Sequence, residues 1–264
     1  MTENRTGVSL DRFHTGRVTA LQPETGYRAA VDPVLLAAAL ERPGRGHRLL
    51  DVGCGAGVAS LCAASLIRAL PGPPGDITLA GIDIDRSMLD LAAESIRRNG
   101  FDQGPVRVEA GLADVGNEET WPEAGSWDQV FSNPPYLEAG AAGGRARPAA
   151  DTANMETAVG LRDWISFMTA MAKPKGRLVL VHRADRVSEI TAAFRQGGVR
   201  AIEIFPFWPK QGAEAKRVIV RGRKGVRTAD RLLPGMVLHR ADGRFTDDAE
   251  AVLNGDAWLL FADG

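Results

Sequence analysis

The sequence lacks most of the features that mark secreted, metal-binding or membrane proteins. Its 264 residues include only two cysteines, Cys54 and Cys62, too few for a disulfide framework or a cysteine metal cluster. No apolar run approaches the ~20 residues of a membrane span, and no stretch resembles a signal peptide. These absences predict a soluble, cytoplasmic protein with no metal site and no membrane partner.

An excess of charge of one sign is also lacking. The chain carries 32 Lys and Arg against 33 Asp and Glu, a net charge of −1. A uniformly basic nucleic-acid binder is therefore excluded, and any surface for nucleic acid must be local. The hydrophobic fraction of 44% is sufficient for the core of an α/β domain.

What is present is an alternation of short apolar runs with amphipathic segments. It predicts strands at 48–53, 77–83, 106–110, 127–132, 177–182, 200–205 and 216–222. Helices are expected at 57–70, 86–99, 161–172 and 185–196, and a further one from Asp32-Pro33 to Leu40, with Asp32 as its cap. In helix 161–172, Trp164 shares a stripe with Leu161, Ile165, Met168 and Met171, which we interpret as core. Residues 1–10 are interpreted as loose and residues 11–27 as rich in turns.

This order of elements predicts the Rossmann-like α/β class, a mostly parallel seven-stranded sheet with helices on both faces. Ligands of such sheets gather at the carboxyl ends of the strands. Both motifs described next begin at predicted strand ends.

The first motif is a glycine turn, Asp51-Val-Gly-Cys-Gly-Ala-Gly57. Gly53, Gly55 and Gly57 allow a sharp turn and close backbone approach to a ligand, with Cys54 inside the turn. A dinucleotide site wants a further glycine at position 58 or 60, which here are Val58 and Ser60. S-adenosylmethionine (SAM) has no pyrophosphate and does not need that glycine. Asp51 is expected to accept a hydrogen bond from its cationic amino group.

Two further acids follow the next strands. Asp83 ends strand 77–83, where a carboxylate can take both ribose hydroxyls, and Ile84 follows it in the same wall. Asp85 is interpreted as the cap of helix 86–99. For Asp114, contact with the adenine amino group and a plain loop role are equally open.

The second motif is Asn133-Pro134-Pro135-Tyr136, directly after strand 127–132. An amino group on an aromatic base is a poor nucleophile because its lone pair is delocalised into the ring. The Asn133 side-chain oxygen and the Pro134 carbonyl can accept its two hydrogens, the prolines stiffen the backbone, and Tyr136 can stack on the base. The alternative is an Asn-Pro turn that only ends a strand. With the glycine turn upstream, the motif favours methyl transfer from SAM to nitrogen without a metal.

On these motifs the chain resembles the class I SAM-dependent methyltransferases that carry Asn-Pro-Pro-Tyr. Gln22-Pro-Glu-Thr-Gly-Tyr-Arg-Ala-Ala-Val-Asp32-Pro-Val-Leu-Leu-Ala37 is similar to the opening motif of the bacterial tRNA(Val) adenine-N6 methyltransferases. The resemblance runs from about residue 11 through 220 and includes Leu232-Leu-Pro-Gly-Met-Val-Leu-His239 and Asp242-Gly-Arg-Phe-Thr246. It implies methylation of adenine N6 next to the anticodon of a tRNA, with tRNA as the substrate partner, and an antiparallel last strand.

The resemblance also implies how the chain is organised. Residues 1–45 would close over the cofactor, residues 46–224 would form the methyltransferase domain, and residues 225–264 would form a tail packed on it. Tyr27, Arg28 and Asp32 would lie near the methionine end of SAM, with Arg28 as the partner of its carboxylate. Monomer and homodimer are both compatible with the sequence.

Two basic segments are candidates for RNA contact. The first holds Lys216, Arg217, Arg221, Arg223 and Lys224 on the last strand, where cations alternate with β-branched residues. A solvated edge strand protected by its charges is an equal alternative. The second is Arg145 and Arg147, in the loop after the amino-group motif, in a position to cover a flipped-out base. His182 and His239 are interpreted as core or surface residues rather than catalytic ones.

Three alternative functions differ from this one in the substrate or in the class of protein. A glutamine side-chain amide is also planar and bears an NH₂ group, and release-factor glutamine N5-methyltransferases resemble this chain at the same four residues. Those enzymes usually carry an extra helical domain, whereas only ~45 residues precede the glycine turn here, which favours nucleic acid. A non-catalytic SAM-fold binding module is disfavoured by the intact motifs, and a nicotinamide oxidoreductase by the missing glycine.

Overall fold

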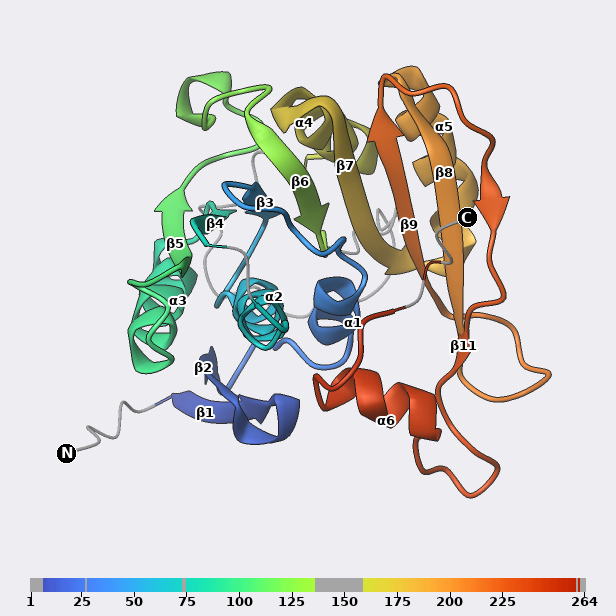
Figure 1. The fold of residues 1–264 in the computed structure, drawn as a ribbon, viewed down its shortest axis with the longest axis horizontal. Coiled ribbons are helices and arrows are strands. Elements are labelled where there is room, and N and C mark those ends of the chain that lie inside the picture. Colours follow the sequence, from blue (N-terminus) through green and yellow to red (C-terminus); the bar gives the residue numbers. More distant parts are fainter. Residues whose placement is uncertain (1–6, 27, 73–74, 136–158, 260, 262–264) are drawn as a thin grey trace, which may run out of the picture.

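A nine-stranded sheet forms the centre of the computed structural model, in the order β10-β8-β9-β7-β6-β3-β4-β5 with β11 also paired to β8 (Figure 1). Residues 7–26, 28–72, 75–135, 159–259 and 261 are described. The long strands are β3 (Arg48–Val52), β4 (Ile77–Asp83), β5 (Val106–Leu112), β6 (Trp127–Ser132), β7 (Ala172–Arg183), β8 (Val199–Trp208) and β9 (Arg217–Lys224).

The strand directions confirm the predicted class. Strand β9 runs antiparallel to both its neighbours, β7 and β8, and the remaining pairs are parallel. The sheet has nine strands rather than seven because β10 (Arg231–Leu232) and β11 (Met236–Val237) extend it beyond β8. Strands of two residues are too short to leave an alternating pattern in the sequence.

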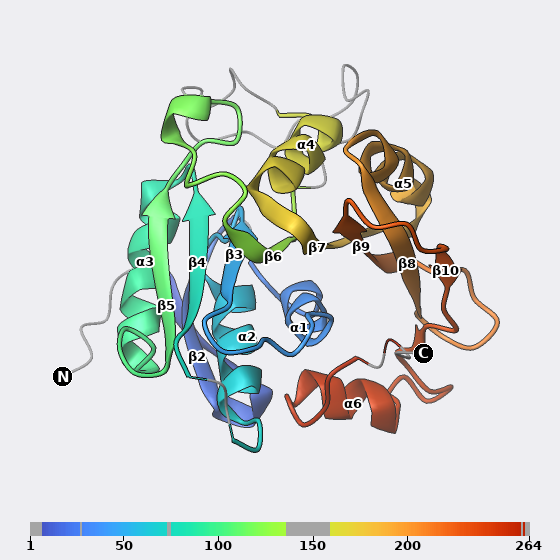
Figure 2. The same cartoon turned by 45° about the horizontal axis from the view of Figure 1, so that its top comes forward.

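Helices cover both faces of the sheet, as predicted (Figure 2). The first face carries α1 (Asp32–Ala38), α2 (Val58–Arg68), α3 (Arg86–Arg98) and α6 (Asp247–Leu253), and the second carries α4 (Leu161–Met171) and α5 (Val187–Gln196). Helix α6 lies in the segment interpreted as a tail, and it contacts α1. Within the described ranges, no helix is both long and apolar enough to cross a membrane.

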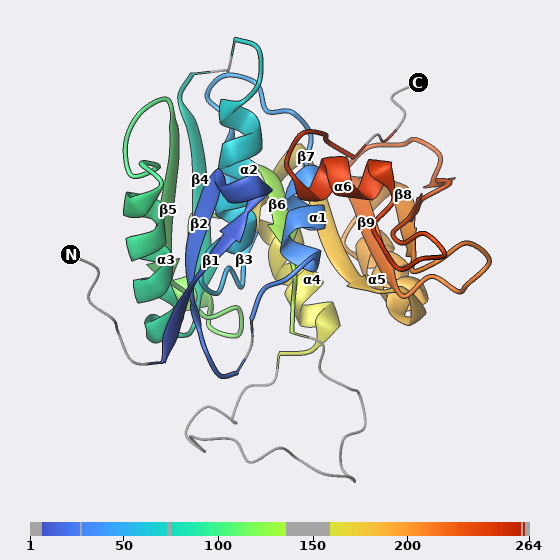
Figure 3. The same cartoon turned by 90° about the horizontal axis from the view of Figure 1, so that it is seen from below.

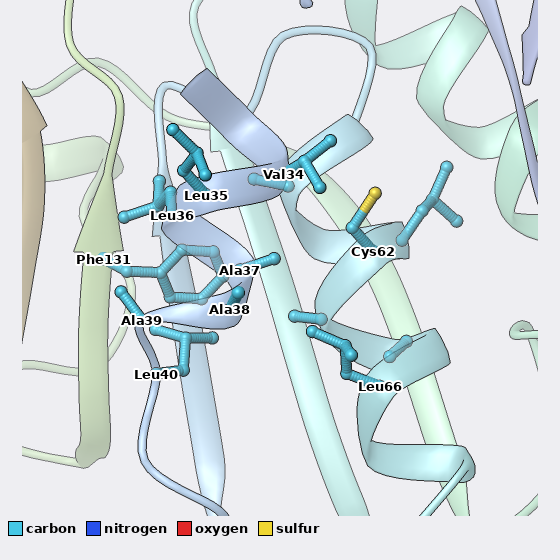
Figure 4. Close-up of a cluster of buried hydrophobic side chains, with 14 of the residues drawn as sticks. Val34, Leu35, Leu36, Ala37, Ala38, Ala39, Leu40, Cys62, Leu66 and Phe131 are labelled. Atoms are coloured by element: carbon cyan, nitrogen blue, oxygen red, sulfur yellow. The ribbon is translucent and has the colours of Figure 1, made fainter. Parts of the chain in front are cut away.

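Helix α1 is buried on all sides. Every residue from Val34 to Leu40 is at most 4% exposed, and these side chains pack with Cys62 and Leu66 of α2 and with Phe131 of β6 (Figure 4). The helix ends at Ala38, two residues before the predicted end at Leu40. Its packing fixes the chain segment in front of it beside the strand ends.

The start of α1 corrects one prediction. Asp32 is the first residue of the helix, and Val31 occupies the N-cap position without a side-chain hydrogen bond. Pro33 stands in the first turn, where its missing N–H costs nothing. The Asp32 carboxylate instead accepts a hydrogen bond from Arg217 Nε at 2.9 Å.

An N-terminal hairpin, β1 (Val8–Phe13) and β2 (Val18–Pro23), was not predicted. It docks on α3 through side chains: Asn99 Oδ1 accepts from Thr19 N at 3.0 Å, and Ser95 Oγ accepts from Leu21 N at 2.9 Å. Figure 3 shows the hairpin on the same side of the sheet as α2 and α6. The interpretation of residues 8–10 as loose was wrong. Segment 11–26 does contain a turn at 14–17 and bends at 24–26, but residues 11–13 and 18–23 are strands. They were missed because the partners that hold them lie on a distant helix.

The site is placed by the centre of the sheet. Strand β3 pairs with β4 on one side and with β6 on the other, so successive connections depart in opposite directions from this point. Such a switch point leaves a crevice at the carboxyl ends of the strands. The register sets Val52 opposite Ser132, so the glycine turn and the Asn-Pro-Pro motif leave the sheet from neighbouring positions.

Candidate functional site

A cavity of about 540 Å³ opens at the carboxyl ends of β3, β4, β5 and β6, a size suited to a cofactor. The residues expected from the sequence to bind cofactor or act in catalysis that line it are Gly53, Gly55, Asp83, Ile84, Asp114, Asn133 and Pro135. A smaller hollow shares Gly53 and Asn133 with the cavity and is also lined by Asp51 and Cys54. The fold therefore brings most of both motifs together around one space.

The glycine turn depends on backbone conformations that favour glycine. Gly53, Gly55 and Gly57 have φ values of 70°, 52° and 79°, all in the left-handed region. The N–H groups of Gly53 and Cys54 both donate to the carbonyl of Ile82, which ties the turn to β4. Gly57 lines neither space and serves as the N-cap of α2, so its role is to start the helix rather than to border the cavity.

Asp83 braces the glycine turn as well as lining the cavity. Its Oδ2 accepts from Gly55 N at 2.7 Å and its Oδ1 from Asp85 N at 2.9 Å. Each oxygen keeps a lone pair for a ligand hydroxyl. The neighbouring Ile84 is 58% exposed and offers an apolar wall. Asp85 caps α3 by accepting from Ser87 N, which confirms that prediction.

Asp51 is a buried carboxylate beneath the turn. It is 2% exposed, and its Oδ2 accepts a hydrogen bond from Ser60 Oγ at 2.7 Å. Burial raises the pKa of Asp51 to about 7, and the nearby charge of Asp83 acts in the same direction. A cationic group placed in the hollow would favour the ionised form of Asp51.

Asp114 follows β5 and is held by its own loop. Its Oδ1 accepts from Gly116 N at 2.8 Å, and its backbone N–H donates to Thr120 Oγ1 at 2.8 Å. The indole N–H of Trp121 donates to the Asp114 carbonyl. Asp114 therefore has the loop role, and because it also lines the cavity, its contact with an adenine amino group stays a prediction.

The amino-group motif leaves β6 toward the same cavity. Asn133 and Pro135 line it, whereas Pro134 is buried. Ser132, just before the motif, is fully buried and donates from Oγ to the Val52 carbonyl at 2.7 Å. The strand end that carries Asn133 is thus fastened to the strand that carries the glycine turn. Tyr136 lies outside the described residues.

The opening segment is arranged differently from what the family resemblance implied. Arg28 Nη2 pairs with the Asp11 carboxylate at 2.6 Å, and Asp32 pairs with Arg217. Neither Arg28 nor Asp32 lines the cavity or the hollow. The segment contributes Pro23, Thr25 and Gly26 to the cavity instead, and Tyr27 is outside the described residues.

The charge of the lining selects among ligands. Asp83, Asp85 and Asp114 line the cavity, whereas no Lys, Arg or His is found among its described lining residues. Carboxylates accept hydrogen bonds from hydroxyl, amino and ammonium groups and repel phosphate. The lining therefore suits a ligand such as SAM, with a ribose and positive charges, and it does not suit a pyrophosphate.

Comparison with known proteins agrees with this chemistry. Residues 43–203 match the family described as "Methyltransferase domain". The chain belongs to this family. It is a SAM-dependent methyltransferase with the Rossmann-like fold.

Individual relatives are distant. The methyltransferase is 22% identical over 214 residues to a tRNA1(Val) (adenine(37)-N6)-methyltransferase of Glaesserella parasuis serovar 5, covering 81% of this chain and 83% of the relative. It superposes on a predicted O-methyltransferase from Agrobacterium tumefaciens with a TM-score of 0.70 and 24% identity, covering 88% of this chain and all of the other. A geranyl diphosphate methyltransferase solved with GPP and sinefungin gives a TM-score of 0.51 at 14% identity, covering 74% of this chain and 78% of that one.

The basic run of residues 216–224 lies on an internal strand, and one of its cations, Arg221, is buried. Strand β9 lies between β7 and β8, so the expectation of an edge strand was wrong. Arg221 is 3% exposed, contacts Glu203 and stacks over the Phe261 ring at 3.4 Å. Burial lowers the pKa of Arg221 to about 10. A residue enclosed in this way has no surface for RNA, which corrects its assignment.

The other cations of the run divide between internal and surface roles. Arg223 pairs with Glu41 at 2.7 Å, and Lys224 Nζ donates to the carbonyls of Thr169 and Ala172. Lys216 is 68% exposed at the start of the run and remains a candidate for RNA contact, together with its neighbour Arg217. Arg145 and Arg147 lie outside the described residues.

Several residues that line the site were missed from the sequence, and Trp164 and Gln22 are two of them. Trp164 was interpreted as core, but it lines the cavity, while Ile165, Met168 and Met171 are buried as expected. Gln22 lines the hollow, and its amide bonds to both the N–H and the carbonyl of Ala29. The sequence held no local signal for the place of Trp164, because the acceptor of its indole N–H, Ser132, is 32 residues away in the chain.

Proposed function

We propose that this methyltransferase transfers the methyl group of SAM to the N6 amino group of an adenine in tRNA. Asn133 carries this proposal, because it lines both the cavity and the hollow at the strand end next to the glycine turn. The similarity to a tRNA adenine-N6 methyltransferase supports the choice of substrate, and that relative's name suggests adenine 37.

The residues around the cavity fit SAM piece by piece. Asp83 would accept the ribose hydroxyls, Ile84 would cover the adenine ring, and Asp114 would accept from the adenine amino group. Asp51 lies under the glycine turn and would face the ammonium group. Since Arg28 is paired with Asp11, the N–H groups at the start of α2 are the better partners for the carboxylate. Gly53, Cys54 and Gly55 would border the methionine end.

Bound SAM supplies an electrophilic methyl group on its sulfonium. The Asn133 side-chain oxygen and the Pro134 carbonyl would each accept one hydrogen of the substrate amino group. These contacts favour the pyramidal form of the nitrogen, whose lone pair then forms the new N–C bond as the C–S bond breaks. The product nitrogen loses one proton to solvent, so no metal and no strong base are needed. Pro135 would keep the backbone rigid, and Tyr136 would stack on the base.

The surface beside the site offers cations for a phosphate backbone. The register places Arg183 of β7 opposite Arg217 of β9, at the end of the sheet from which Asn133 departs. Lys216 precedes Arg217 and is largely exposed. Phosphate contacts at this end would orient a tRNA with its target base toward the cavity.

The segment before α1 would close over the cofactor. Three of its residues, Pro23, Thr25 and Gly26, line the cavity and support this role.

A transfer assay with two acceptors tests the proposal. The purified enzyme is incubated with labelled SAM and either unmodified tRNA or a release-factor protein, and the products are digested and identified. We expect label in N6-methyladenosine. Label in N5-methylglutamine would show that the substrate is a protein glutamine, although the reaction is still methyl transfer to an amino group. Absence of transfer to either acceptor would favour the non-catalytic module.

A further inference from the structure

Three polar groups connect helix α4 with the two strand ends that carry the motifs. Trp164 Nε1 donates to Ser132 Oγ at 2.9 Å, and Ser132 Oγ donates to the Val52 carbonyl at 2.7 Å. Ser132 immediately precedes Asn133, and Val52 immediately precedes Gly53. The chain of hydrogen bonds therefore runs from α4 to the bases of both motifs.

The indole ring also touches the glycine turn directly. A Cβ atom added at Gly53 would lie 2.8 Å from Cζ2 and 3.0 Å from Cη2 of Trp164. These distances place the six-membered ring of the indole against the Gly53 backbone. Since Trp164 lines the cavity as well, one side chain contacts Gly53, bonds to Ser132 and forms a wall of the site.

From this geometry we infer that Trp164 is a positioning residue for methyl transfer. Its ring fixes the glycine turn on the donor side, and its N–H fixes the Ser132 hydroxyl and hence the neighbouring Asn133 on the acceptor side. The distance between these two sides decides the alignment of the nitrogen with the methyl group. Misplacement by about 1 Å can cost on the order of 10²-fold in rate. The inference rests on the proposed function for the role of Asn133.

The test separates catalysis from cofactor binding. Trp164→Phe keeps an aromatic ring but removes the N–H donor together with Cζ2 and Cη2, the atoms nearest Gly53. Ser132→Ala removes the acceptor while leaving the indole. For each variant we expect kcat to fall roughly ten- to hundredfold while the Kd for SAM stays within about twofold of wild type. Because both variants break the hydrogen bond between Trp164 and Ser132, the double variant should lose little more than Trp164→Phe alone.

Trp208→Phe is the matched control. The Trp208 indole also donates one hydrogen bond, to the Pro234 carbonyl at 3.2 Å, but on β8 away from the cavity. We expect its kcat to be unchanged. Trp164→Phe and Ser132→Ala both retaining more than half of wild-type kcat would overturn the inference, as would a rise in Kd that accounts for the whole loss. If Trp164→Phe does not fold, Ser132→Ala alone decides.

The kcat of each variant is compared with the wild-type kcat on whichever acceptor the wild-type enzyme methylates. Transfer to glutamine instead of adenine would contradict the proposed substrate. The comparison of variant and wild-type kcat would still test the positioning role. Normal transfer to tRNA by Trp164→Phe and Ser132→Ala would contradict the positioning role alone. If the wild-type enzyme transferred no methyl group to either tRNA or release-factor protein, both the proposed function and the positioning role would be contradicted.

Discussion

Asp83 and Gly55 are joined by a hydrogen bond of 2.7 Å from the Gly55 N–H to Asp83 Oδ2. This contact links the end of β4 to the glycine turn after β3, so the acid proposed to bind the ribose also shapes the turn proposed to hold the methionine end. The two halves of the cofactor site are thus mechanically coupled. Damage to one is expected to affect the other.

Asp83→Asn should weaken SAM binding strongly. The amide has one acceptor oxygen instead of two and no charge, so it cannot hold Gly55 and Asp85 and also accept both ribose hydroxyls. Hydrogen bonds to charged groups contribute about 1.5–3 kcal/mol, which corresponds to a rise in Kd of about ten- to hundredfold. Isothermal titration calorimetry checks this, and the control is Asp90→Asn, which changes an exposed carboxylate on α3. An unchanged Kd would remove Asp83 from the site.

SAM binding should depend on pH through Asp51. Burial raises the pKa of Asp51 from 3.8 to about 7, so the folded free enzyme binds a proton that the unfolded chain releases. Its contribution to stability is present below pH 4 and is lost as the pH rises through about 7. The ammonium group of SAM prefers the ionised carboxylate, so affinity should increase between pH 6 and 8, by at most about tenfold per unit.

Asp51→Asn is the variant that isolates this dependence. It keeps an oxygen for the Ser60 hydroxyl but cannot ionise. We expect weaker SAM binding with little change between pH 6 and 8, and a higher midpoint of urea unfolding at pH 8, where the wild type carries a buried charge. A variant whose affinity still follows the wild-type pH curve would show that another group titrates.

Glu203→Gln should destabilise the fold rather than the site. Glu203 is buried and accepts from Arg177, Arg221 and Arg231. Burial alone would raise its pKa, but the hydrogen bonds from Arg231 and Arg221 hold the pKa below its usual value. Removing the carboxylate takes the counter-charge from the buried Arg221 guanidinium, at a cost of about 3–5 kcal/mol.

Urea unfolding measures this cost directly. The control is Glu94→Gln, which breaks ion pairs of Glu94 with Arg97 and Arg98 on the surface of α3 and should cost less than about 1 kcal/mol. Equal effects of the two substitutions would contradict the view that the basic run on β9 serves the core.

Lys216→Glu should weaken tRNA use without changing SAM affinity. Lys216 lies at the end of the sheet that carries Asn133 and is 68% exposed. Loss of one phosphate contact should raise the KM for tRNA. It should also make the slope of log binding constant against log salt concentration shallower by about one. Arg45→Glu makes the same kind of charge change at the opposite end of the strands, just before β3. A similar loss in both variants would indicate only a non-specific effect of charge.

The sequence was most informative where structure is local. The glycine turn, the Asn-Pro-Pro segment and the core strands could be placed because apolar runs and turn residues mark them. The burial of Arg221 could not be foreseen, since its partner Glu203 lies on a neighbouring strand. The hairpin likewise depends on Ser95 and Asn99, and the position of Trp164 depends on Ser132. These contacts join residues far apart in the chain, and local patterns do not report them.

The central claim is that Asn133 directs a methyl group from SAM to adenine N6 in tRNA. The most direct measurement is mass spectrometry of nucleosides from total tRNA of cells that lack the gene, complemented with wild type or with Asn133→Ala. The account predicts that wild type restores N6-methyladenosine and that Asn133→Ala, with a rate lower by about 10²–10³, leaves it near the level of the deletion. Equal N6-methyladenosine in the deletion, wild-type and Asn133→Ala strains would contradict it.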